Sequence, residues 1–101
     1  MPVYLYRLLP PRPTFPADMS PAEGAAMQSH AGYWMEQMRE GAAAVFGPVF
    51  DPQGTYGVAV LTVADAGEAR RVAGNDPVVT AGLGFRFEVH EMPGAMVRGA
   101  D

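Results

Sequence analysis

The sequence predicts an α+β fold in which four antiparallel strands carry two helices on one face. Strand-like and helix-like segments alternate in the order β-α-β-β-α-β along the 101 residues. Helix-start signals occur at "SPAE" (20–23) and "DAGE" (65–68), and a Pro-Gly turn, "DPQG" (51–54), joins the two middle strands. This order is typical of the ferredoxin-like fold. The length fits one domain over residues 1–101.

The first strand, residues 3–9, is apolar on both sides. Alternation along "VYLYRLL" places two tyrosines, Tyr4 and Tyr6, on one side with Leu8, and places Arg7 among aliphatic residues on the other. A guanidinium in such a strand needs a partner. The sequence leaves two alternatives for the partner of Arg7: the carboxylate of Glu88 on a neighbouring strand, or an anionic substrate.

A proline-rich loop follows the first strand. Residues 10–19, "PPRPTFPADM", contain four prolines, which exclude a regular helix or strand. A loop of this length in a small domain is often a lid or a binding loop. Within it, Phe15 is placed to fold back over an apolar surface and to contact a ligand there.

The first helix is predicted from Pro21 to about Glu40. Ser20 can cap it, proline suits its first position, and Glu23 can complete a capping box. Gly41 then suits its C-terminal end. The apolar side of the helix carries Met27, His30, Trp34 and Met38.

The second half of the chain completes the pattern. Pro48 predicts an edge position or a bulge for the second strand, and Ala69, Val72 and Ala73 face inward from the second helix. The expected segments are strands 42–50 and 55–63, helix 64–75, a turn-rich connection 76–84, strand 85–92, and a loose tail 93–101.

Composition excludes several functions. The net charge is −4 with 7 basic residues, which argues against nucleic acid as a partner. No apolar run approaches a membrane span, and the N-terminus does not resemble a signal peptide. The absence of cysteine removes thiolate chemistry and fits a cytoplasmic protein. No histidine–carboxylate spacing predicts a metal site, and no fingerprint predicts a cofactor.

The uncovered sheet face predicts a homodimer. Helices on one side leave the other side open, and this chain is too apolar for that side to face water without cost. Packing the open faces of two copies against each other removes the exposed patch.

Several short motifs resemble the YciI-like (YCII-related) family over residues 3–91. They are "H-x-x-Y-W" at 30–34, "G-P-V" at 47–49, "G-x-Y-G" at 54–57 and "N-D-P-V-V-x-A-G-L" at 75–83. The resemblance implies a dimeric α/β barrel. It also implies an active site built from a histidine and an aspartate, which correspond to His30 and Asp76. One relative eliminates chloride from a chlorinated hydroxyhydroquinone.

His30 and Asp76 each have two interpretations. The histidine is either a hydrogen-bonded core residue or a general base, and the aspartate is either the cap of an Asx-turn before Pro77 or the partner of the imidazole. A carboxylate on one ring nitrogen would leave the other nitrogen free for proton transfer. Trp34 and Tyr6 are either core residues or walls of a substrate pocket.

The leading hypothesis is a small, cofactor-free enzyme. His30 would move protons, Asp76 would orient it, and Trp34, Arg7, Tyr6 and Phe15 would contact a small aromatic or enolisable substrate in an elimination or isomerisation. A non-catalytic small-molecule-binding or accessory dimeric module is the alternative. A third possibility is a dimer in which the pair only ties the helix to the last turn.

Overall fold

The computed structural model describes residues 1–99 and has the predicted element order with one short additional helix. In chain order the elements are β1 (Val3–Leu9), α1 (Pro21–Arg39), β2 (Ala43–Val49), β3 (Tyr56–Thr62), α2 (Ala66–Gly74), α3 (Pro77–Thr80) and β4 (Arg86–Glu91). Among the described residues, no helix has the length and apolarity that crossing a membrane requires.

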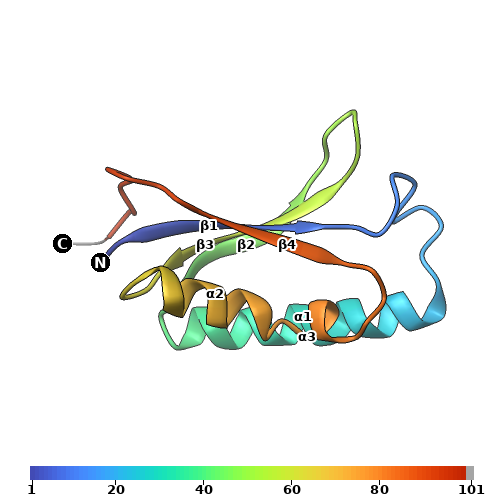
Figure 1. The fold of residues 1–101 in the computed structure, drawn as a ribbon, viewed down its shortest axis with the longest axis horizontal. Helices are drawn as coiled ribbons and strands as arrows, with labels where there is room; N and C mark the ends of the chain where they lie inside the picture. The colour runs from blue at the N-terminus through green and yellow to red at the C-terminus, as the bar shows by residue number, and fades with distance from the viewer. Residues whose placement is uncertain (100–101) are drawn as a thin grey trace.

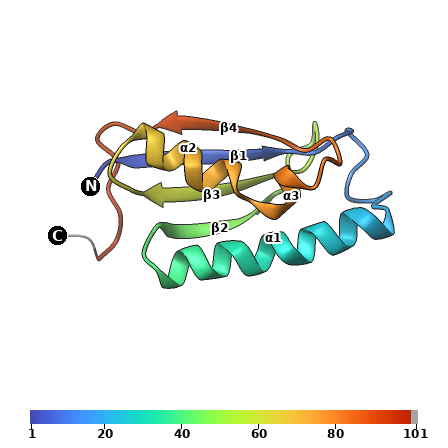
Figure 2. The same ribbon diagram turned by 60° about the horizontal axis from the view of Figure 1, so that its bottom comes forward.

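The four strands form one sheet in the order β2-β3-β1-β4, and all three neighbouring pairs are antiparallel. Figure 1 shows the sheet nearly edge-on with all helices on one side. Figure 2 shows α1 running beside β2 while α2 lies over the other half of the sheet. The ferredoxin-like prediction is therefore confirmed, and Pro48 lies on an edge strand, as its missing N–H predicted.

The core lies between the sheet and the helices. Tyr4, Tyr6 and Leu8 of β1 are buried on the helix side, whereas Arg7 is only partly covered on the opposite side. In the described part of the chain no helix covers that opposite side, which carries Val45 with 52% of its surface exposed. Pairing of two such faces in a homodimer stays a prediction.

Helix α1 begins as predicted. The Ser20 hydroxyl accepts from the Glu23 N–H at 3.1 Å, and the Glu23 carboxylate accepts from the Ser20 N–H at 2.9 Å. The helix ends before Gly41, whose φ of 88° few other residues adopt. Met38, which the sequence places on the apolar side of α1, is 44% exposed in the last turn of the helix.

Helix α2 also follows the prediction, with Ala69, Val72 and Ala73 buried. The predicted turn 76–84 instead contains α3, which Asp76 caps by accepting from the Val78 N–H. Residues 93–99 form no helix or strand, and the rest of the predicted tail, 100–101, lies outside the described residues.

Candidate active site

Asp76, which lies between α2 and α3 in the chain, is the centre of a buried hydrogen-bond network. Its side chain is fully buried. Its Oδ2 accepts from the Tyr6 hydroxyl at 2.6 Å, from Trp34 Nε1 at 2.8 Å and from His30 Nδ1 at 2.7 Å. Its Oδ1 accepts from the Val78 N–H at 3.1 Å. Strand β1, helix α1 and helix α3 thus converge on one carboxylate.

These donors keep the carboxylate ionised. Burial alone raises the pKa of Asp76, but hydrogen bonds from His30, Tyr6 and Trp34, with the charge of His30, outweigh it and lower the pKa below its usual value. Burial, and then the neighbouring carboxylate, raises the pKa of Tyr6, so its hydroxyl stays protonated and keeps donating. The network is therefore an anion held by three protonated groups.

The network determines which nitrogen of the His30 ring carries the hydrogen. An ionised carboxylate only accepts, so Nδ1 must carry the hydrogen that points at Asp76. Nε2 is then the basic nitrogen of the neutral ring. It has no hydrogen-bond partner among residues 1–99, and it is not sealed from solvent. This arrangement can accept a proton at Nε2 and stabilise the resulting imidazolium with the buried carboxylate.

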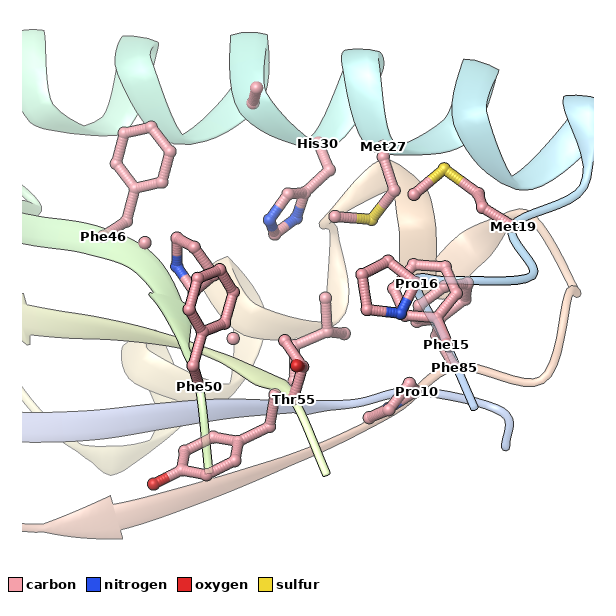
Figure 3. Close-up of a pocket in the computed structure, with 16 residues that line it drawn as sticks. Pro10, Phe15, Pro16, Met19, Met27, His30, Phe46, Phe50, Thr55 and Phe85 are labelled. Carbon is pink, nitrogen blue, oxygen red and sulfur yellow. The ribbon is translucent and has the colours of Figure 1, made fainter. Parts of the chain in front are cut away.

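A cavity of about 390 Å³ lies beside His30, between α1 and the sheet. Figure 3 shows the ring projecting from α1 into this space, between Met27 and Phe46. Among the described lining residues, His30 is the only base, and no carboxylate or arginine is present. The walls are mostly apolar: Leu8, Pro10, Phe15, Pro16, Met19, Met27, Ala31, Phe46, Gly47, Pro48, Phe50, Thr55, Tyr56, Gly57 and Phe85.

Of the aromatic residues expected at a substrate, Phe15 lines this cavity and the other two do not. Trp34 is fully buried and Tyr6 is 1% exposed, and their rings pack together with centroids 4.8 Å apart. They lie behind the imidazole, where they hold Asp76. The structure thus gives both residues a contact with the network and no contact with the cavity.

Arg7 lies on the other side of the sheet from His30. Its Nη1 is 3.1 Å from Glu88 Oε1, the first of the two partners predicted for it, and its guanidinium lies 4.6 Å from the centroid of the Tyr56 ring. It lines an open cleft that shares Pro10, Thr55 and Tyr56 with the apolar cavity but does not contain the histidine. The structure therefore does not bring Arg7 together with His30 and Asp76.

Sequence reasoning missed the cavity wall formed by the second strand and its turn. Phe46 and Phe50 line the cavity together with Pro48 between them. Alternation in a strand places positions 46, 48 and 50 on the same side, so the pattern was present in the sequence. It gave no sign of a cavity, because the distance between α1 and the sheet depends on the whole fold.

Sequence reasoning also missed how the proline-rich segment is attached. Arg12 donates from Nη1 and Nη2 to the two oxygens of Glu23, each at 2.7 Å, and from Nε to Asp18 Oδ2 at 2.9 Å. Thr14 donates to the same oxygen of Asp18 at 2.5 Å. Glu23 is buried, with 6% of its surface exposed. An arginine among prolines, next to a helix start with a glutamate, was the available signal.

Acidification should weaken this attachment. Hydrogen bonds from Arg12 and then from the Ser20 backbone outweigh burial and lower the pKa of Glu23 to about 2. A lowered pKa stabilises the fold above the unfolded value, and the gain is lost as pH falls through the folded value. Between about pH 4.5 and 2, wild type should therefore lose more unfolding free energy than Glu23→Gln, as urea titrations can measure.

The matched control for acidification is Glu36→Gln, an exposed glutamate on the same helix. It should leave the slope of stability against pH close to that of wild type. Equal slopes for wild type and Glu23→Gln would contradict the lowered pKa of Glu23.

Comparison with known proteins gives one family. The model of the YCII-related domain matches residues 7–93, which include the histidine, the aspartate and all the residues that line the cavity. No curated protein matches the chain. Within residues 1–99, no cluster of three or more His, Asp or Glu side chains is placed to hold a metal ion.

Proposed function

The chain belongs to the YCII-related family, and from this premise we propose that it is an enzyme in which His30 transfers protons to and from a small, largely apolar substrate. Asp76 holds the ring and balances its charge. One observation supports this most strongly: a ring nitrogen without a protein partner faces a cavity, while the other is fixed 2.7 Å from a buried carboxylate.

The proposed step needs no group beyond the side chains present. Nε2 takes a proton from an acidic C–H or O–H of the substrate, and the ring becomes an imidazolium beside Asp76. In an isomerisation, His30 returns this proton to another atom of the substrate. In an elimination, the electron pair left behind expels a leaving group. General base catalysis of this kind contributes about 10²- to 10⁴-fold.

The cavity favours an uncharged substrate with an aromatic or enolisable ring. Its walls are apolar, and a charged ligand without a partner there would lose its hydration. A neutral acid avoids this cost, because ionisation by His30 creates the anion and the imidazolium together. A cavity of about 390 Å³ lies at the small end of the usual range for ligand sites.

The binding of 4-nitrophenol tests this proposal, because its absorbance distinguishes the phenol from the phenolate. At a pH below the pKa of the free probe, wild type should bind it and shift its spectrum towards the phenolate. His30→Gln should bind it as the neutral phenol. His90→Gln, which alters an exposed histidine on β4, should behave as wild type.

A non-catalytic binding module is the second candidate, and the apolar lining of the cavity favours it. The binding of 4-nitrophenol also distinguishes the binding module from the enzyme. A probe that binds to wild type but remains the neutral phenol would contradict proton transfer and support the module.

A further inference from the structure

The proline-rich segment 10–19 forms one wall of the cavity. Pro10, Phe15, Pro16 and Met19 all line it. Figure 3 shows Phe15, Pro16 and Met19 gathered at one end, with Phe46 and Phe50 across the cavity from them. The size of the space next to His30 thus depends on where this segment is held.

Two attachments hold the segment. On the sheet side, the ring of Phe15 packs edge-on against Phe85 with centroids 5.2 Å apart. On the helix side, Arg12 binds Glu23 of α1 with two hydrogen bonds, and within the segment it binds Asp18 through both its carboxylate and its backbone oxygen. The first attachment belongs to the wall itself, whereas the second lies outside the cavity.

Arg12 connects the wall to the helix that carries the base. Glu23 is fixed in the first turn of α1 by the capping box, and His30 follows about two turns later. A planar guanidinium that binds a carboxylate through two parallel hydrogen bonds fixes orientation as well as distance. The wall and the imidazole therefore share one rigid support.

We propose that Arg12 is a positioning residue that sets the size of ligand that the cavity accepts. It does not line the cavity and would touch no ligand there. It acts by holding Phe15, Pro16 and Met19 at a fixed distance from His30. The inference rests on the proposed function only in that it takes the cavity to be the binding site.

A purely structural role predicts something different. The Arg12 side chain is 34% exposed but its partner Glu23 is buried, so the ion pair also stabilises the fold. If the ion pair only stabilised the start of α1, its loss would lower the free energy of unfolding and change the affinity for all ligands by the same factor. A positioning role changes the affinity for large and small ligands by different factors.

The affinities for two phenols of different size test which of these roles Arg12 has. Dissociation constants of 4-methylphenol and 4-phenylphenol are determined for wild type, Arg12→Gln and Glu23→Gln, which break the ion pair from opposite sides. In both variants the ratio of the two constants should move in favour of the larger phenol by at least about fivefold, a change that small differences in pocket fit commonly produce. Arg12→Lys keeps the charge without the bidentate geometry and should fall in between.

Arg39→Gln is the matched control, because it removes an exposed arginine paired with Glu36 at the far end of the same helix. It should leave the ratio unchanged. A ratio in both Arg12→Gln and Glu23→Gln equal to that of wild type would overturn the inference while leaving the proposed function intact. If neither phenol binds to wild type, the cavity is not the binding site and both proposals fail.

Discussion

Asp76→Asn will lower the free energy of unfolding by about 3–5 kcal/mol, because three buried donors lose their charged acceptor and each hydrogen bond to a charged group contributes about 1.5–3 kcal/mol. Asparagine keeps the shape of the side chain but replaces one acceptor with a donor. If its oxygen takes the place of Oδ2, its NH₂ meets the Val78 N–H. If it is turned over, the NH₂ meets three donors, from Tyr6, Trp34 and His30. Either orientation leaves buried donors facing each other.

Urea denaturation followed by circular dichroism measures this loss, and Asp65→Asn is the matched control. Asp65 also caps a helix, α2, but it is exposed, and asparagine caps nearly as well as aspartate. The control should stay within about 0.5 kcal/mol of wild type. An Asp76→Asn protein as stable as the control would show that the carboxylate is not the charged acceptor of this network.

The loss should also depend on pH. Since the folded pKa of Asp76 lies below its usual value, the carboxylate stabilises the fold above that usual value, and the gain disappears as pH falls through the folded pKa. The stability difference between wild type and Asp76→Asn should be largest near neutral pH and shrink on acidification. In the same variant, bound 4-nitrophenol should shift towards its neutral form, because the imidazolium loses its anionic partner.

Local signals were sufficient to predict most of the fold. The Ser20–Glu23 capping box predicted the start of α1, and alternation in β1 placed the buried Tyr4, Tyr6 and Leu8 on the side opposite Arg7. The exception was α3, because a four-residue helix is too short to show a period. Its cap and proline, Asp76 and Pro77, were present in the sequence and were interpreted as a turn.

Met38 is exposed, although it belongs to the apolar side of α1, because of where the helix lies in the fold. The predicted apolar stripe of α1 assumed contact along the whole helix, but α1 runs beside β2 at the edge of the sheet. Trp34 is covered on all sides there, whereas Met38 in the last turn stays 44% exposed. A helical period shows which residues share a side, and only the placement of the helix decides how far that side is covered.

The pairing of His30 with Asp76 could be expected only because the motifs around both residues resemble one family. They are 46 positions apart, and no spacing rule links them. The role of Tyr6 and Trp34 as hydrogen-bond donors to Asp76 could not be predicted from the sequence. A buried aromatic residue at an apolar position looks the same whether its polar atom meets a carboxylate or a backbone carbonyl, since the fold alone sets the direction of that atom.

Trp34→Phe tests whether the tryptophan serves the carboxylate as well as the core. Phenylalanine keeps much of the ring packing against Tyr6 but removes the N–H that donates to Asp76 at 2.8 Å. Hydrogen bonds to charged groups contribute about 1.5–3 kcal/mol, so the free energy of unfolding should fall by at least this amount. Trp34→Ala also leaves a cavity and should lose about 3–5 kcal/mol, a large share of the stability of a small domain.

Circular dichroism must follow these unfolding transitions, because Trp34 is the chain's one tryptophan and its removal abolishes tryptophan fluorescence. Met35→Ala alters the neighbouring, exposed residue and should change stability by no more than about 0.5 kcal/mol. If Trp34→Phe matched this control, the indole N–H would have no energetic role at Asp76, and the remaining donors, from Tyr6, His30 and the Val78 N–H, would be sufficient to hold the buried charge.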